Sequence, residues 1–344
     1  MNDSPSSQNP LVTVGIPVFN GEKEIPKVMT AILAQDYPNI EVLFADNCSS
    51  DDSLSIILNL IKTNKNVRLI TSERNNGALA NINRLFENAS GEYMLIACLD
   101  DAWSHDFISS SVRTLENSKD APLCIPHVNL CLEPMNEIYY SISLEDNYFS
   151  GSRPMRFWKT LRSFPSVGWY GLYRMSAVRE VGPIPISIAG DLVFLQKLSL
   201  AGEFRHSSNA VLTFSVPKQW NTREQDFAFF YGNSKRPWLK RPFLIVLGTQ
   251  LSSISKMKIS PIHKFVFLTQ ILLNLLLDKT AILFFQALKF FPIYEDTKKC
   301  IVSILYRRFL KPKWLIIVAK DLFFNREIYG RFGYNKSQNT RCVN

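Results

Sequence analysis

The stretch VTVGIPVFNGEKEIPKVMTAILAQDYPNIEVLFADNCSSDD, residues 12–52, decides the fold. It opens with an apolar run that ends before Asn20-Gly21, continues with apolar residues at helical spacing over 25–33, and returns to a second apolar run over 40–45. Short apolar runs bounded by turn residues predict buried strands, and a spacing of three to four residues predicts an amphipathic helix. The stretch therefore predicts a strand, a helix and a second strand.

The same alternation continues to about residue 130. Strands are predicted at 67–70, 93–99 and 122–130, and helices at 54–61, 78–86 and 107–115. Strand–helix alternation builds a parallel sheet with helices on its faces. The sequence thus predicts an α/β fold over its first third, followed by a less regular, aromatic-rich middle.

Polar residues follow four of the predicted strands. These are Phe19-Asn20-Gly21, Asp46-Asn47, residues 73–77 and Asp100-Asp101. In open α/β sheets, ligands bind beyond the carboxyl ends of the strands. We therefore expect these residues to converge on one edge of the sheet, with carboxylates after two strands.

Two common nucleotide-binding motifs are absent from the sequence, and their absence limits the kinds of nucleotide site that the chain can form. No Gly-x-Gly-x-x-Gly follows the first strand and no Gly-Lys-Ser/Thr loop occurs, which disfavours a dinucleotide fold and a P-loop. Asp100-Asp101 offers the hard oxygen ligands that Mg²⁺ and Mn²⁺ take. The alternative is that the two acids cap the helix beginning near Asp106 or form a plain turn. Ser49, Ser50 or Asp51 is likewise a good N-cap, but Asp46 comes too early for that role.

Two segments together resemble the family 2 glycosyltransferases. Residues 12–52 resemble the opening of that family, and Asn75–Trp103 (NNGALANINRLFENASGEYMLIACLDDAW) continues the match in order. The resemblance covers about 11–110 closely and 165–215 loosely. It implies a GT-A fold, a Rossmann-like mixed sheet flanked by helices, here with a C-terminal, mostly helical extension. It also implies a nucleotide-diphosphate sugar donor, and inversion at the anomeric carbon without a covalent intermediate.

The resemblance also implies roles for individual residues of the first half. Pro17, Phe19 and Glu22 are expected at the nucleotide, and Asp46 at its base. Asp100 is expected to bind Mg²⁺ or Mn²⁺, with Asp101 beside it at the donor. Cys98 stands two residues before Asp100, so a strict Asp-x-Asp is absent.

Arg74, in the loop after the third strand, carries a charge suited to phosphate. The alternative is an ordinary exposed loop arginine.

The catalytic base is predicted in the middle of the chain. Ala189-Gly190-Asp191-Leu192 precedes apolar residues at helical spacing, and it resembles the setting of the family's base. Asp191 is therefore predicted to take the proton from the acceptor hydroxyl as that oxygen attacks the anomeric carbon. The alternative is that Asp191 is only an N-cap.

Charge is divided unevenly along the chain. Residues 1–234 hold 19 basic and 25 acidic residues, whereas residues 235–344 hold 20 basic and 5 acidic ones. The tail has two apolar stretches, 265–277 and 281–291, separated by Asp278-Lys279, and both are shorter than the ~18 residues of a spanning helix. Basic charge beside apolar helices is typical of contact with a membrane surface. Nucleic acid is not expected as a partner, since the basic residues interleave with aliphatic runs rather than stacking aromatics.

Cysteine spacing and the N-terminus bear on the compartment. The six cysteines form no Cys-x-x-Cys pair, which predicts reduced thiols, and residues 1–10 lack the regions of a signal peptide. We therefore expect a cytoplasmic protein, peripheral on the inner membrane face.

These observations predict three parts. Residues 1–10 are a flexible N-terminus, 11–234 a GT-A domain, and 235–344 a basic, apolar helical region. Within the domain, 11–130 is the nucleotide-binding half and 131–234 the acceptor half. The predicted activity is that of an inverting hexosyltransferase acting on a saccharide or lipid-linked acceptor, in the synthesis of cell-surface polysaccharide or glycan. The alternative is a catalytically degenerate member that binds nucleotide-sugar or saccharide without turnover.

Overall fold

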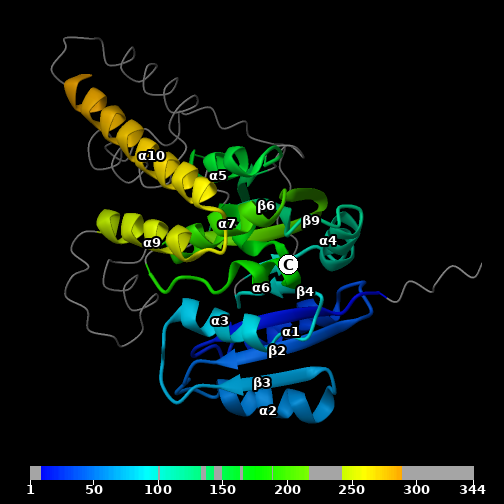
Figure 1. Cartoon of the computed structure of the whole chain (residues 1–344). Helices are drawn as coiled ribbons and strands as arrows, with labels where there is room; N and C mark the ends of the chain where they lie inside the picture. The colour runs from blue at the N-terminus through cyan, green and yellow to red at the C-terminus, as the bar shows by residue number, and fades with distance from the viewer. Residues whose placement is uncertain are drawn as a thin grey trace, which may run out of the picture.

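The computed structural model describes residues 9–99, 101–132, 137–142, 149–162, 166–187, 189–216 and 242–288. Within these residues the chain forms one large mixed sheet flanked by helices, and two further helices lie against the end of the molecule far from the first strands (Figure 1). The predicted α/β class, with a mixed sheet and a helical continuation, is confirmed.

The first half of the sheet consists of the four strands that the sequence predicts first, and all four are parallel. Their order is β3-β2-β1-β4, so β1 lies between β2 and β4. Residues that follow these strands therefore meet at one edge of the sheet. The bounds are β1 (Val12–Val18), β2 (Ile40–Asp46), β3 (Val67–Thr71) and β4 (Tyr93–Ile96).

The second half of the sheet was predicted only in part, through the strand at 122–130. β8 pairs antiparallel with both β4 and β6, β9 runs parallel to β6, and β9 also pairs antiparallel with β5. β7 pairs with β6. These pairings join segments far apart in the sequence, so no local sequence pattern predicts them. The bounds are β5 (Asp101–Trp103), β6 (Leu123–Leu132), β7 (Glu137–Ile142), β8 (Leu172–Arg174) and β9 (Arg205–Val216).

The helices predicted between the first strands are all present. α1 buries an apolar stripe toward the sheet, and α3 packs against β1 and β2. The bounds are α1 (Ile25–Leu33), α2 (Ser53–Thr63), α3 (Ala78–Asn88), α4 (Phe107–Glu116), α5 (Arg153–Arg162), α6 (Met175–Val181), α7 (Gly190–Ala201), α9 (Pro242–Lys256) and α10 (Pro261–Leu288), with a short 3₁₀ helix η1 (Ser166–Tyr170).

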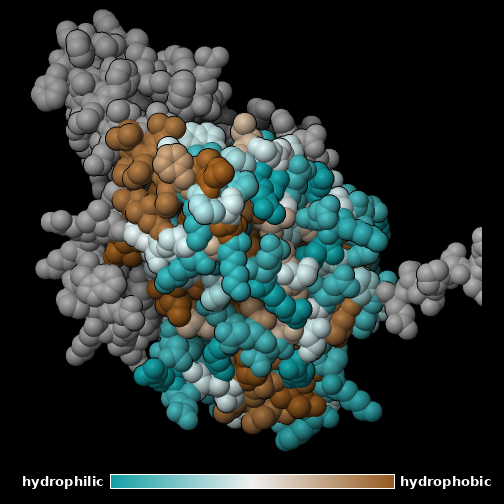
Figure 2. Space-filling view, in the orientation of Figure 1, coloured by the Kyte–Doolittle hydropathy of each residue, from teal (hydrophilic) through white to brown (hydrophobic). Residues whose placement is uncertain are grey.

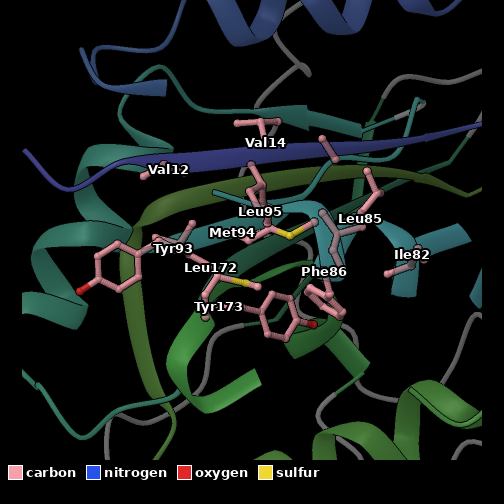
Figure 3. Close-up of a cluster of buried hydrophobic side chains, with 14 of the residues drawn as sticks. Val12, Val14, Ile82, Leu85, Phe86, Tyr93, Met94, Leu95, Leu172 and Tyr173 are labelled. Atoms are coloured by element: carbon pink, nitrogen blue, oxygen red, sulfur yellow. The ribbon is translucent and has the colours of Figure 1, made fainter. Parts of the chain in front are cut away.

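An aromatic contact joins the two halves of the domain inside the main core (Figure 3). Phe86 of α3 meets the ring of Tyr173 edge-on, with centroids 5.7 Å apart, and stacks on Phe194 of α7 at 5.5 Å. Such pairs contribute about 0.5–1.5 kcal/mol beyond the area they bury. Because Phe86 lies on the helix that covers β1, this contact fixes α7 relative to the first strands.

The C-terminal helices pack on the domain through a second, smaller core. Phe157 of α5 and Phe267 of α10 are fully buried with ring centroids 4.9 Å apart, and Gln250 of α9 donates to Gln196 of α7 at 3.0 Å. The predicted boundary at residue 234 lies outside the described residues.

α10 runs without a break through Asp278-Lys279, where the sequence suggested two separate apolar segments. Neither Asp nor Lys breaks a helix as Pro does, so the charged pair interrupts the apolar composition but not the backbone. The outer side of α10 is apolar, as Figure 2 shows at its upper left. Among the described helices, none combines the length and apolarity needed to cross a bilayer.

Among the four cysteines that the structure describes, one departs from the predicted reduced state. Cys48, Cys98 and Cys124 are reduced thiols, as predicted, but Cys131 of β6 is disulfide-bonded. The prediction for Cys131 is wrong because disulfide pairing depends on approach in space, which the spacing of cysteines along the chain does not reveal.

Candidate active site

The ends of β1, β2 and β4 lie side by side. Val18 of β1 pairs with Asp46 of β2, and the N–H of Ala97, just after β4, donates to the Gly15 carbonyl at 2.9 Å. A Cβ on Gly21 would come within 2.3 Å of Leu99 Cδ1, so the loop after β1 touches the segment leading to Asp100. We call residues 17–22, 46–51, 97–99 and 101 the carboxyl edge.

The loops after β1 and β2 are joined by reciprocal hydrogen bonds. The Asn20 N–H donates to Ser49 Oγ at 2.9 Å, and Asn20 Oδ1 accepts from the Ser50 N–H at 2.8 Å. The Gly21 N–H donates to Ser53 Oγ at 2.8 Å. Asn20 adopts the left-handed conformation, with φ of 53°, which Asn tolerates better than most residues. The two loops therefore form one rigid rim beside the strand ends.

Asp46 is the last residue of β2 and is almost fully buried, with 3% of its surface exposed. Both of its carboxylate oxygens accept from the Ser49 N–H at 3.3 Å. Arg84 of α3 reaches the Asp46 backbone carbonyl at 3.4 Å. Asp46 therefore sits in a fixed orientation at the edge, and its remaining lone pairs can accept hydrogen bonds from a ligand.

The three nucleotide candidates from β1 and its loop have different surroundings. Pro17 is half-buried within β1, and the Phe19 ring is 48% exposed beyond the strand. Glu22 is part of the rim itself: its Oε2 accepts from the Asp52 N–H at 3.1 Å, and its own N–H donates to Asp51 Oδ2 at 3.0 Å. Glu22 thus satisfies the N–H of Asp52, and Asp51, one of the caps that the sequence suggested, accepts from the Ser53 N–H at the start of α2 at 3.1 Å.

Three asparagines that the sequence placed at strand ends, without a role of their own, extend this network toward β3. Asn47 Nδ2 donates to Asn75 Oδ1 at 2.8 Å, and Asn47 Oδ1 accepts from the Asn76 N–H at 3.1 Å. Their signal in the sequence was the Asn75-Asn76-Gly77 turn after the third strand. Arg74 is exposed, and its Nε donates to Asn76 Oδ1 at 3.0 Å, so it borders this network.

The metal site is predicted at Asp100 and Asp101, which follow β4 in the sequence. Asp101 is 8% exposed and opens β5, and its Oδ2 accepts from the Cys98 N–H at 3.2 Å. Its place in a strand contradicts the alternative that Asp101 caps α4, whose N-cap is Asp106. Asp100 itself lies outside the described residues.

The part of the chain that the structure describes holds no cluster of three or more His, Cys, Asp or Glu side chains suited to a metal. Mg²⁺ usually takes only one or two protein carboxylates and completes its shell with substrate phosphates and water. Carboxylate oxygens at this turn fit that donor set. Asp100 and Asp101 remain the candidate ligands on these grounds.

α7 begins at Gly190, and its N-cap is Ala189, in the left-handed conformation with φ of 59° and ψ of 28°. A Cβ on Gly190 would lie 1.9 Å from the Pro185 carbonyl oxygen, so only glycine fits there. Asp191 is therefore one residue inside the helix, and the alternative that Asp191 is the N-cap is wrong. A carboxylate in the first turn is stabilised by the positive end of the helix dipole.

The surroundings of the first turn of α7 locate Asp191. The Tyr173 hydroxyl is buried and donates to the Trp169 carbonyl at 2.8 Å. Burial, and then the negative charge of Asp191, raise the pKa of Tyr173 well above its ordinary value. The start of α7 also lies against the first turn of α3, since a Cβ on Gly190 would come within 2.9 Å of Leu79 Cδ1.

The described residues thus place Asp46, the rim and residues 97–99 and 101 together, and they place Gly190, which precedes Asp191, against the first turn of α3. Arg74 stands at the exposed margin. The arrangement offers backbone donors and oxygen ligands for a phosphorylated ligand, and beside them a half-buried carboxylate able to accept a proton.

Comparison with known proteins supports a glycosyltransferase domain. Residues 13–182 match the model of Glycosyl transferase family 2. A Methanococcus voltae dolichyl N-acetyl-alpha-D-glucosaminyl phosphate 3-beta-D-2,3-diacetamido-2,3-dideoxy-beta-D-glucuronosyltransferase is 28% identical over 178 residues, 49% of this chain and 54% of that protein. A Campylobacter jejuni GalNAc(5)-diNAcBac-PP-undecaprenol beta-1,3-glucosyltransferase is 30% identical over 107 residues, 31% of this chain and 33% of that protein. The matches span only about a third to a half of these curated relatives.

The fold has solved counterparts. The structure of S. aureus TarS in complex with UDP-GlcNAc superposes with a TM-score of 0.54 at 17% identity, covering 77% of this chain and 72% of that one. At this identity the likeness concerns the fold alone, and it confirms the predicted GT-A architecture. Through residues 13–182, this chain belongs to glycosyl transferase family 2.

Proposed function

We propose that the chain transfers a sugar from a nucleotide-diphosphate sugar to a hydroxyl of a saccharide or lipid-linked acceptor, with inversion at the anomeric carbon. The observation that supports this proposal is that Asp191 is the second residue of α7, whose first residue lies against Leu79 of α3, just after the asparagine network that extends the carboxyl edge. One site thereby holds a proton acceptor and the ligands of a phosphorylated donor.

The rim and Asp46 are assigned to the nucleotide. Pro17 and Phe19 form an apolar surface beside the rim, and Asp46 accepts hydrogen bonds from the base. Glu22 acts by holding the loop, since its carboxylate bonds the start of α2. Arg74, at the exposed margin, is positioned to pair with a phosphate.

Asp100 and Asp101 are assigned to Mg²⁺ or Mn²⁺ and to the donor diphosphate. When bound, the divalent ion neutralises negative charge on the diphosphate. The family pattern supports this role for Asp100, and the buried Asp101 carboxylate supports a polar turn at that point.

Asp191 is assigned as the base. The acceptor oxygen attacks the anomeric carbon, the bond from that carbon to the diphosphate oxygen breaks, and Asp191 takes the acceptor proton. A single displacement of this kind inverts the anomeric configuration. General-base catalysis of this kind contributes about 10²–10⁴-fold to a rate.

The relatives and the tail support a lipid-linked acceptor and a membrane location. Two relatives bear names that specify dolichyl- and undecaprenol-linked saccharides. The basic region 235–344 and the exposed apolar side of α10 suit contact with the inner face of the membrane. A role in cell-surface polysaccharide or glycan synthesis follows from such an acceptor.

A panel of UDP- and GDP-sugars tests the activity. Release of nucleoside diphosphate is measured for the intact chain with Mn²⁺ and with EDTA, in parallel with thermal shifts. We expect one donor class both to stabilise the chain and to be turned over only with the metal, and the anomeric configuration of the product to be inverted.

The alternative, a degenerate binding protein, is motivated by Cys98 standing where a strict Asp-x-Asp would have an acid. Stabilisation by a donor without any metal-dependent turnover would support that alternative and contradict the proposed transfer.

A further inference from the structure

A cavity of about 1250 Å³ lies apart from the carboxyl edge, and its lining includes none of the residues of that edge. Its walls come from the start of α5, the end of α6, the following loop 182–187, α7, α9, residues 257–259 and the first turns of α10. It thus lies where the C-terminal helices meet the domain.

Positive charge dominates the lining. Five cationic side chains face one carboxylate, Glu180, and none of the five forms an ion pair with a described carboxylate. Cations of this kind around a concave site are suited to an anion. The five are Arg153, Arg179, Lys197, Lys256 and Lys258.

Lys197 is the most buried of these cations, with 7% of its surface exposed. Its Nζ donates to the Pro183 carbonyl at 3.1 Å, and an ammonium has two further hydrogens to donate. Burial lowers the pKa of Lys197 to about 8. A buried ammonium with donors to spare is a group that a bound anion would stabilise.

Exposed apolar side chains continue from the mouth of this cavity along α10. Phe267 and His263 line the cavity, and Ile262 and Phe265 on the same turns are 76% and 71% exposed. The exposed row extends along the helix at helical spacing and forms the apolar area at the upper left of Figure 2. We call this row the α10 stripe: Ile262, Phe265, Leu272, Leu273 and Leu276.

We propose that this cavity binds the phosphate headgroup of a membrane lipid, whose hydrocarbon chains lie along the α10 stripe. The cationic cavity suits a phosphate group, and the α10 stripe, which begins at the same helical turns, suits a hydrocarbon chain. A phospholipid carries both groups, whereas a free phosphate would leave the stripe uncovered. The inference rests on the membrane contact proposed above and does not depend on sugar transfer.

Vesicle co-sedimentation of the intact chain tests the site. The vesicles are phosphatidylcholine alone or phosphatidylcholine containing phosphatidic acid, and the test variant is Lys256→Gln/Lys258→Gln, two exposed positions that leave the core intact. The matched control is Lys62→Gln/Lys65→Gln, which removes the same charge near α2, at the end of the molecule far from α10 (Figure 1).

We expect the intact chain and the control to bind the phosphatidic acid vesicles more tightly than phosphatidylcholine alone. The cavity variant should lose roughly fivefold in affinity per lysine removed, since a cation near an anionic membrane contributes about 1 kcal/mol. Equal losses in test and control variants would show nonspecific attraction and overturn the proposal. Failure of the intact chain to bind either vesicle would overturn the membrane contact as well.

A soluble ligand separates the headgroup from free phosphate. Short-chain phosphatidic acid should raise the melting temperature of the intact chain more than inorganic phosphate does, and Lys197→Met should abolish the difference. Equal shifts with both ligands would show a simple phosphate site and contradict the lipid assignment. Donor turnover is measured on the same variants, so loss of transfer is scored separately from loss of lipid binding.

Discussion

Burial raises the pKa of the Tyr173 hydroxyl, and the negative charge of Asp191 raises it further, although Tyr173 and Asp191 belong to different elements, β8 and α7. Tyr173 is fixed by its hydrogen bond to Trp169 and by its ring contact with Phe86. The first residue of α7, Gly190, lies against the first turn of α3, since a Cβ there would come within 2.9 Å of Leu79 Cδ1. Asp191 directly follows Gly190 in the chain.

Asp191→Asn should abolish most of the transfer without unfolding the chain. The amide cannot accept the acceptor proton, so kcat should fall by about 10²–10⁴-fold while the KM for the donor changes little. Steady-state kinetics checks this, with Glu87→Gln, an exposed acid on α3, as the control. An unchanged kcat in Asp191→Asn would remove Asp191 from the reaction.

Gly190→Ala should destabilise the chain because its Cβ would collide with the Pro185 carbonyl oxygen at 1.9 Å. Relieving that contact means moving backbone, and overpacking of this kind costs about 1–3 kcal/mol. Gly248→Ala is the matched control: no atom lies within 4 Å of a Cβ there, and alanine in helix α9 should stabilise by about 0.5–1 kcal/mol. Urea unfolding measures both, and equal effects would show that α7 does not depend on the close approach.

Because of Glu41, the free energy of unfolding should decrease as the pH falls into the acid range. Burial raises the pKa of Glu41, but hydrogen bonds from Thr13, Ser90 and Arg68, together with the charge of Arg68, outweigh it, so the net shift is downward. A carboxyl with a lowered folded-state pKa stabilises the fold above its unfolded pKa, and that stabilisation is lost as the pH falls through the folded value.

Glu41→Gln should therefore lower the free energy of unfolding at neutral pH by about 1–3 kcal/mol. The difference from the native chain should shrink at about pH 3, where the carboxyl is largely protonated in the unfolded chain. Urea titrations at the two pH values measure it. A difference that stays constant with pH would show that the ionised form of Glu41 is not what stabilises the strands.

The α10 stripe should account for membrane partitioning. Phe265→Ser/Leu276→Ser replaces two exposed apolar side chains and should reduce the membrane-bound fraction, because each buried apolar side chain contributes about 1.5–3 kcal/mol. Leu54→Ser/Leu58→Ser changes two exposed leucines of α2 and should leave partitioning unchanged. Point variants suit this test better than truncation, since α10 also covers Phe157 of the domain.

Local patterns in the sequence were enough for the first half of the sheet. Each predicted strand and helix from β1 to α4 is set by its own apolar spacing and turn residues, and parallel order follows from the helical connections. The short strands β5 and β8 could not be found in this way. Both have three residues and exist only because distant partners, β9 for β5 and β4 and β6 for β8, lie beside them.

The residues of the candidate site likewise divide into those that local patterns predict and those that depend on contacts distant in the sequence. The positions of Asp46 at a strand end and of Asp191 at a helix start were predicted because both are local features. The role of Glu22 in joining the two loops was not predicted, since its partner Asp52 lies on another loop. The same holds for Gly190, whose need for glycine comes from the Pro185 carbonyl in the preceding loop.

Calorimetric titration tests the central claim most directly, using the nucleoside diphosphate that stabilises the intact chain, with Mn²⁺ present. Asp46→Asn keeps an oxygen for the Ser49 N–H but removes the charge offered to the nucleotide, and it should weaken binding by about tenfold or more. Asp191→Asn should bind the nucleotide as the native chain does. Native affinity in Asp46→Asn, or loss of affinity only in Asp191→Asn, would contradict the assignment of the carboxyl edge to the donor.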